Sequence, residues 1–199
     1  MMNSEEMPEI RAIWDEAKGH IDRGDYDKAI ETYQYVLIRY EDNAVAVEYA
    51  NAYLGDIFLT TRRPNLAEKH LKKAISTAPE NSHYHYLLGF TYSIIERWQK
   101  AVAEFQKALR YEPDNSEYER GLGWAISNSG NITEGIGHLY RALEVSPSNL
   151  HAMTDMATAM LMLGNIDKAR EYGEMALGVD PGYALARNLL QTTDRIEGK

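Results

Sequence analysis

Hydrophobic positions along most of the chain recur at helical spacing, in pairs of short segments separated by polar turns. The stretch SHYHYLLGFTYSIIERWQKAVAEFQKALRYEPDN, residues 82–115, is the clearest example. An apolar run is followed by a polar turn at Glu96-Arg97 and then by a second amphipathic run, which ends at Pro113. Proline stops a helix because it donates no N–H and its ring clashes with the preceding turn. The pattern predicts two helices that pack as a hairpin.

Two markers indicate that this hairpin repeats. Small residues suited to a close helix crossing lie 34 residues apart, and prolines keep the same interval, which is typical of helix-turn-helix repeats. The first step, from Ala29 to Ala67, is longer at 38 residues and predicts that 44–47 add one turn to the next helix. The recurring residues are Ala67, Ala101, Gly135 and Ala169, and Pro79, Pro113, Pro147 and Pro181.

The set Leu88-Gly89-x-x-Tyr92, Ala101-x-x-x-Phe105, Ala108 and Pro113 resembles the tetratricopeptide repeat. The resemblance covers about 10–183 and implies an all-α fold, a right-handed α-solenoid of about five helix-turn-helix repeats whose first helices line a concave groove. We expect repeats at 10–43, 44–81 (with the extra helical turn), 82–115, 116–149 and 150–183. An acidic N-terminal arm at 1–9, disordered or loosely docked, precedes them, and a capping helix and tail at 184–199 follow.

Glycines add local detail to this array. Gly24, Gly130 and Gly164 occupy the same place before the turn between two helices, where a left-handed residue commonly ends a helix. Gly135 stands where the other repeats have alanine, and Gly137 follows it. Because glycine inside a helix costs about 1 kcal/mol relative to alanine, we expect this helix to be the softest in the array.

The resemblance also implies which side chains of each first helix reach the groove. The middle of that surface is aromatic and flanked by charge, which is typical of a peptide-binding surface. Two alternatives stay open: the rings pack against neighbouring repeats as core, or the N-terminal arm or a second copy of the chain fills the groove. The predicted partner-binding residues are Trp14, Lys18, Tyr49, Tyr53, Asp56, His83, Tyr86, Phe90, Arg120, Trp124 and His151.

Composition narrows the classes of partner. The formal net charge of −9 argues against nucleic acid, whose phosphates it would repel. The chain has no cysteine, which excludes disulfides and thiolate metal sites. The N-terminal segment lacks the apolar core of an export signal, and no later run approaches the length of a membrane span. We therefore expect a cytoplasmic protein that does not bind membranes.

Signatures of catalysis or metal binding are not found in the sequence. It contains no Gly-rich phosphate loop, no HExxH and no histidine pair at i, i+4; His83 and His85 are two residues apart and face different ways on a helix. We expect no enzyme activity, catalytic residue, metal or cofactor.

The sequence predicts a protein–protein interaction scaffold or adaptor that binds a peptide segment or helix of a partner protein in the concave groove. The alternative is a self-associating structural scaffold that organises a homo-oligomeric assembly. The carboxylate clamp by which this family grips the acidic EEVD-type tail of heat-shock chaperones needs Lys, Asn and Arg at set positions. The sequence argues against that partner, because those positions hold Trp14, Lys18, Tyr53, His83 and Leu87. The identity of the partner does not follow from the fold.

Overall fold

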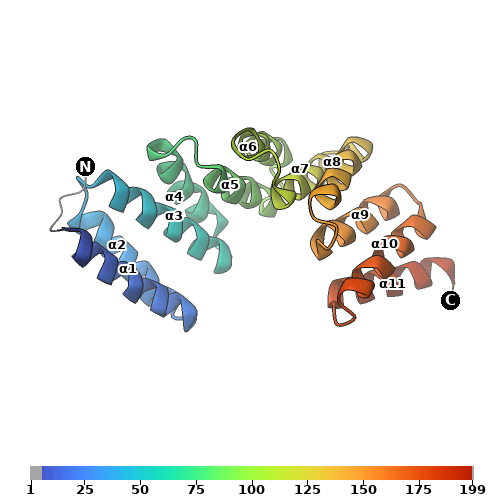
Figure 1. Ribbon diagram of the computed structural model, residues 1–199, viewed down its shortest axis with the longest axis horizontal. Helices are drawn as coiled ribbons and strands as arrows, with labels where there is room; N and C mark the ends of the chain where they lie inside the picture. The colour runs from blue at the N-terminus through green and yellow to red at the C-terminus, as the bar shows by residue number, and fades with distance from the viewer. Residues whose placement is uncertain (1–5, 199) are drawn as a thin grey trace. The chain divides into compact units, whose positions relative to one another are not determined.

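The computed structural model describes residues 6–198, which form eleven helices and no strand (Figure 1). The predicted all-α class, with helices in successive pairs and one more at the end, is confirmed. The helices are α1 (Glu6–Asp22), α2 (Tyr26–Arg39), α3 (Ala44–Thr60), α4 (Pro64–Thr77), α5 (Ser82–Ile94), α6 (Trp98–Tyr111), α7 (Ser116–Asn128), α8 (Ile132–Val145), α9 (Leu150–Met162), α10 (Ile166–Val179) and α11 (Ala184–Glu197).

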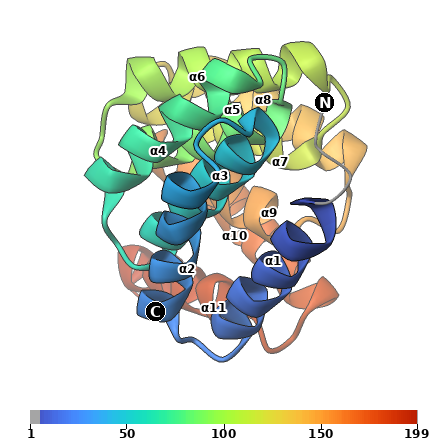
Figure 2. The same cartoon turned by 90° about the vertical axis from the view of Figure 1, so that its left-hand side faces the viewer.

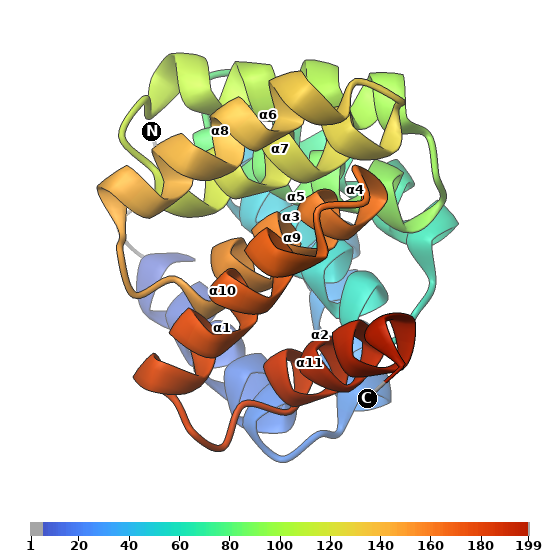
Figure 3. The same cartoon turned by 90° about the vertical axis from the view of Figure 1, so that its right-hand side faces the viewer.

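The chain folds into two compact units, Met1–Glu96 and Arg97–Lys199. The first unit holds α1 to α5 and the second holds α6 to α11, so the predicted repeat at 82–115 has one helix in each. Within each unit every helix packs on the next one along the chain (Figures 2 and 3). First helices also contact one another, α3 with α5 and α7 with α9, and α9 contacts α11.

Asparagine caps many of the helices. In α3, for example, the Asn43 Oδ1 atom accepts a hydrogen bond of 3.1 Å from the backbone N–H of Ala46. The first N–H groups of a helix have no partner within it, so a cap of this kind contributes about 1 kcal/mol relative to alanine. The equivalent caps of α5, α7, α8, α9 and α10 are Asn81, Asn115, Asn131, Asn149 and Asn165.

The turns between paired helices use left-handed backbone at one equivalent position. Gly24, Gly130 and Gly164 have φ of +77°, +108° and +75°, as the sequence predicts. Arg62 and Glu96 take the same place in the other two turns, with φ of 57° and 56°. A side chain in this conformation costs about 1–2 kcal/mol, so these two turns are strained where the glycine turns are not.

The start of the chain departs from the expected acidic arm. Residues 6–9 of that segment are helical and begin α1, while residues 1–5 lie outside the described part. Pro8 is compatible with this position, because the first N–H groups of a helix have no intrahelical partner to lose. Helix α3 begins at Ala44 and has 17 residues, whereas α5, α7 and α9 have 13 each.

Small residues set the distance between packed helices. A Cβ atom on Gly55 of α3 would lie 2.6 Å from the Leu71 side chain of α4. One on Gly121 of α7 would lie 2.7 Å from the Phe105 ring of α6. Both large side chains are almost fully buried, so glycine at these places lets a leucine or phenylalanine lie directly on the backbone of a neighbouring helix.

Two backbones approach each other closely between α7 and α8. A Cβ atom on Gly135 would lie 2.5 Å from the carbonyl oxygen of Gly123 and would overlap the Ser127 Oγ atom. A Cβ atom on Gly123 would in turn lie 2.7 Å from the Gly135 carbonyl oxygen. Gly135 inside α8 was expected to destabilise that helix. This loss of stability is offset by the close contact between the α7 and α8 backbones, which the Cβ atom of an alanine would prevent.

The glycine that replaces the repeat's alanine is required here, and this can be tested. We expect Gly135→Ala to destabilise the protein by about 1–3 kcal/mol through overpacking. Gly137→Ala is the matched control in the same helix, because a Cβ atom there meets nothing within 4 Å. It should stabilise by about 0.5–1 kcal/mol. Urea unfolding followed by circular dichroism measures both changes, and stabilisation by both substitutions would contradict the close contact.

A buried polar pair joins α3 to α4. The Asn51 Nδ2 atom donates to the Val47 carbonyl at 2.8 Å, so its Oδ1 atom accepts from His70 Nδ1 at 2.9 Å. Both side chains lie in the core, at 1% and 9% exposure. Burial lowers the pKa of His70 to about 4, and Lys73 and Lys69 add to the decrease. The histidine is therefore neutral and works as a core hydrogen-bond donor.

This lowered pKa predicts a pH dependence of stability. The folded-state pKa of about 4 lies below the ordinary value of 6.5. The stabilisation that neutral His70 gives to the folded state is therefore complete above pH 6.5 and is lost as the pH falls toward 4. Lowering the pH from 7.5 to 5 should reduce the free energy of unfolding by about 2 kcal/mol through this residue. The His70→Asn protein keeps a hydrogen-bond donor but cannot titrate there, so we expect its free energy of unfolding to decrease by about 2 kcal/mol less over the same pH range. Urea titrations at both pH values measure the difference, and equal falls in the two proteins would refute it.

Candidate functional site

In the first unit the predicted partner-binding residues come from three helices. Each helix spaces them three or four positions apart, which places them on one face of that helix. We call this set the first-helix surface. It comprises Trp14 and Lys18 of α1, Tyr49, Tyr53 and Asp56 of α3, and His83, Tyr86 and Phe90 of α5.

Several rings of the first-helix surface are open to solvent. Tyr49, Tyr53 and Phe90 are 42%, 40% and 41% exposed, while Trp14 and Tyr86 are half-buried. The alternative that these rings belong to the core is therefore wrong for the first three. Exposed aromatic side chains that gather on one surface are typical of interaction sites.

The rings of α1 and α3 are held by contacts with other aromatic side chains. The Trp14 and Tyr49 ring centroids lie 5.3 Å apart, across the two first helices. Tyr53 stacks on Tyr33 of α2 with 5.1 Å between centroids and 6° between planes, and Tyr33 is only 1% exposed. A partner would therefore meet rings that are already oriented, which lowers the entropy cost of binding.

Helix α5 presents a row of three rings. His83 lies 6.2 Å from Tyr86, and Tyr86 lies 6.5 Å from Phe90, each pair nearly parallel. His85 faces the opposite way, as its spacing from His83 predicts. It is buried, and its Nε2 atom hydrogen-bonds the Pro79 carbonyl at 2.9 Å. The two neighbouring histidines thus have different roles, one at the surface and one in the core.

A pocket of about 280 Å³ opens between α3 and α5. Loss of surrounding water raises the pKa of the Asp56 carboxyl, and His83 opposes that rise. The Tyr84 hydroxyl donates to Glu48 Oε1 at 3.0 Å. Asn81 and Tyr84 are absent from the set of site residues predicted from the sequence. The feature that could have indicated them is Asn81 itself, which caps the start of α5 beside this face. The lining residues are Tyr49, Ala52, Tyr53, Asp56, Asn81, His83, Tyr84 and Leu87.

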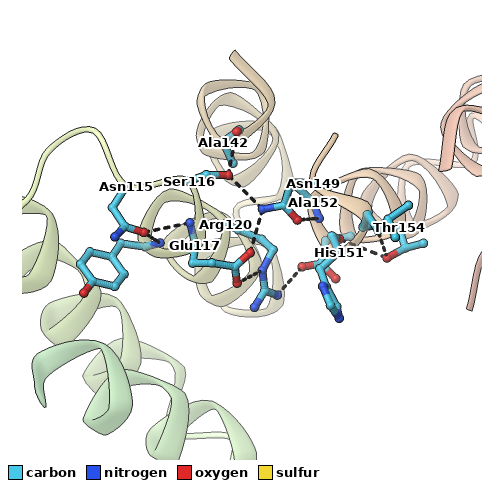
Figure 4. A network of polar contacts seen from close by, with 12 residues as sticks. Asn115, Ser116, Glu117, Arg120, Ala142, Asn149, His151, Ala152 and Thr154 are labelled. Atoms are coloured by element: carbon cyan, nitrogen blue, oxygen red, sulfur yellow. Dashed lines mark hydrogen bonds and ion pairs between the residues drawn. The ribbon is translucent and has the colours of Figure 1, made fainter. Parts of the chain in front are cut away.

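In the second unit Arg120 is engaged within the fold (Figure 4). Its Nη1 atom donates to Asp155 Oδ2 at 2.9 Å, and its Nε atom donates to Glu117 Oε2 at 3.0 Å. The Arg120 and Asp155 side chains are 15% and 18% exposed. Burial raises the pKa of Asp155, and the guanidinium limits that rise. Arg120 was predicted to face a partner, but its charge is used to join α7 to α9.

The same network fixes the start of α9. The Asn149 Nδ2 atom donates to Glu117 Oε1 at 2.7 Å and to Ser116 Oγ at 2.9 Å, and Ser116 Oγ donates to the Ala142 carbonyl of α8 at 2.9 Å. Figure 4 shows these groups meeting where α7, α8 and α9 come together. Asn149 and Glu117, like Arg120 and Asp155, are about one repeat apart in sequence. That spacing is the feature of the sequence that could have predicted these pairs.

The other two predicted residues of the second unit remain near the surface. Trp124 is half-buried, and His151 is exposed with its ring edge-on to Tyr183 at 5.9 Å. A second pocket, of about 340 Å³, lies between α9 and α11. Its lining residues are Thr154, Asp155, Thr158, Leu161, Leu185, Asn188, Leu189 and Thr192.

Helix α11 is fastened to α10 by apolar and ionic contacts. A Cβ atom on Gly173 would lie 2.9 Å from Leu190, so α11 leucines take the space that a large residue would fill. Arg170 forms ion pairs with Asp194 at 2.8 Å and Glu197 at 2.6 Å. Helix α11 therefore covers the outer face of α10.

Within residues 6–198, no set of three or more histidine and carboxylate side chains is grouped so that it could hold a metal ion. No helix of this part of the chain combines the length and the apolar character needed to cross a membrane.

Comparison with known families gives three matches, all to models described as tetratricopeptide repeat, over residues 15–81, 82–115 and 128–192. The resemblance inferred from residues 82–115 is thereby confirmed. A search of curated proteins finds no match.

Solved structures with a similar fold are numerous, and three illustrate the range. PilW, a type IV pilus biogenesis factor, is 19% identical with a TM-score of 0.85, over 99% of this chain and 88% of that chain. PilF of Pseudomonas aeruginosa is 18% identical with a TM-score of 0.76, over 95% and 84%. YrrB, described as a TPR protein with an unusual peptide-binding site, is 20% identical with a TM-score of 0.68, over 88% of each chain. At these identities the likeness concerns the fold.

A double-mutant cycle tests whether Arg120 is structural. We expect Arg120→Met and Asp155→Leu to show a coupling free energy of about 1.5–3 kcal/mol, as for a mostly buried charged hydrogen bond. The exposed pair Lys168 and Glu171 is the matched control and should show no coupling above error. Urea unfolding of the single and double variants supplies the four free energies. Equal coupling in both pairs would mean that Arg120 is available to a partner.

Proposed function

The chain belongs to the tetratricopeptide repeat family, and from this we propose that it is a protein-interaction scaffold that binds a peptide segment or helix of a partner on the first-helix surface. The family matches support a role in protein interaction generally. The observation that carries the finer proposal is that Tyr49 and Tyr53 line a pocket while 42% and 40% exposed, and that Phe90 is 41% exposed on the next first helix, α5.

The physical basis is an apolar centre with a polar rim. Three open rings offer a large contact area at low entropy cost, since each has only two side-chain torsions and Tyr53 is already stacked. Lys18, Asp56 and His83 supply charge and hydrogen-bonding groups around them. Such a surface binds polypeptide through a few aromatic anchors, and the polar rim selects among sequences.

The second unit adds candidate contacts of its own. We propose that Trp124 and His151 contact a partner there, because both reach the surface of their first helices. Arg120 contributes to the position of α9 rather than to the partner, given its pairs with Asp155 and Glu117. The description of YrrB, which names a peptide-binding site, supports a peptide ligand as the class to test first.

Self-association is the second candidate. It is favoured by exposed aliphatic side chains that are not members of the first-helix surface, namely Ile38 at 76%, Leu185 at 53% and Ile196 at 55% exposure. Contact between copies through these residues would bury them. Light scattering across a concentration range separates the two candidates, because a monomer at high concentration removes the second.

The partner-binding proposal predicts the effect of removing two rings. Tyr53→Ala with Phe90→Ala should reduce capture of partner proteins at least tenfold, since each anchor of this type contributes about 2 kcal/mol. The matched control is Tyr35→Ala, which removes a ring that is 49% exposed on the second helix α2. Affinity capture with quantitative mass spectrometry measures the loss.

Circular dichroism must show that the doubly substituted protein keeps its helix content and its cooperative unfolding. If the same proteins are captured in equal amounts by the wild type and by this variant, the first-helix surface is not the binding site.

A further inference from the structure

The pocket between α3 and α5 contains one carboxylate and no lysine or arginine among its lining residues. Within the described part of the chain, Asp56 has no hydrogen bond or ion pair. Two other carboxylates of this unit are already paired, Glu68 with Lys72 at 2.6 Å and Glu48 with the Tyr84 hydroxyl at 3.0 Å. Asp56 is therefore an exposed acceptor on the pocket wall that forms no hydrogen bond or ion pair with the described residues.

The surroundings of Asp56 favour a positive ligand. Its pKa is raised by loss of water, so a cation entering the pocket would restore favourable interactions to its charged form. Glu48 adds negative charge next to the pocket wall through its hydrogen bond with Tyr84. The whole chain carries a net charge of −9, which attracts basic segments over longer distances.

The aromatic rings that line the pocket favour one kind of positively charged ligand. Tyr49 and Tyr53 are four residues apart on α3, and Asp56 follows three residues later, so the two rings and the carboxylate share one helix face. The Tyr53 ring is held parallel to Tyr33. Ring faces attract cations, and a planar guanidinium both stacks on a ring and pairs with a carboxylate through two N–H groups.

We propose that the pocket between α3 and α5 receives an arginine side chain of the partner polypeptide, with its guanidinium against the Tyr49 and Tyr53 rings and paired with Asp56. This inference rests on the proposed function, and it specifies which side chain of the partner the first-helix surface recognises. His83 also lines this pocket, and its imidazole ring carries two nitrogen atoms that can form hydrogen bonds. Lysine fits less well, because its ammonium is a strongly hydrated point charge that cannot stack.

The first experiment selects peptides from a random phage-displayed library on wild-type protein, on Asp56→Asn and on Tyr53→Ala. We expect wild-type protein to enrich peptides with arginine at one fixed position. Asp56→Asn should lose that arginine preference while still enriching aromatic-dependent binders. Tyr53→Ala should enrich few or none of the wild-type peptides.

The second experiment uses one selected peptide in three forms, with arginine, lysine or citrulline at the fixed position. Citrulline keeps the shape of arginine and removes its charge. By isothermal titration we expect at least tenfold weaker binding of the citrulline form and intermediate binding of the lysine form. Asp56→Asn should weaken the arginine form at least tenfold and leave the citrulline form within twofold. Glu31→Gln, an exposed carboxylate on α2, is the matched charge control and should leave all three within twofold.

The outcomes distinguish this inference from the proposed function. If selected peptides depend on Tyr53 but show no preference for arginine, or if citrulline binds as well as arginine, the inference is wrong and the proposed function stands. If Glu31→Gln weakens binding as much as Asp56→Asn, the attraction is unspecific and the pocket assignment fails. If no selected peptide depends on Tyr53, the proposed function itself fails. Dimerisation of the chain through this pocket, seen by light scattering, would also overturn the assignment.

Discussion

Close crossing of neighbouring helices at small residues is the constraint on which the rest of this structure depends. The helices are short, and helices of about 12–15 residues are marginal in water without packing. Gly55 lets Leu71 lie against the α3 backbone, and Gly123 with Gly135 lets two backbones meet. Each buried leucine or phenylalanine held in this way contributes about 1.5–3 kcal/mol. Stability therefore comes from the interfaces between helices more than from any single helix.

This packing also divides the aromatic residues into two groups. Tyr33 and Tyr84 lie in the core, at 1% and 5% exposure, while Tyr49, Tyr53 and Phe90 remain outside at about 40%. Core rings support outer ones, as Tyr33 does beneath Tyr53. A rigid frame that holds rings open to solvent suits recognition of a polypeptide, because little order has to be gained on binding.

Charged residues at similar places in the array have different roles. Arg120 and Asp155 satisfy each other and join two first helices, whereas Asp56 keeps its bonding capacity beside a pocket. The difference arises because an arginine and an aspartate about one repeat apart meet across neighbouring helices. Asp56 has no such partner among the described residues; loss of surrounding water raises its pKa, and the neighbouring His83 opposes that rise.

The sequence by itself determined the helices, their turns and the repeat period, because these depend on local preferences. Gly130 takes positive φ, and Pro113 follows the end of α6, each within a few residues. Only the tertiary structure decided which rings stay open, that Arg120 is already paired, and that Gly135 is required at its crossing. Those outcomes depend on how far each helix is rotated and how closely it approaches its neighbour, and that geometry is set jointly by side chains tens of residues apart.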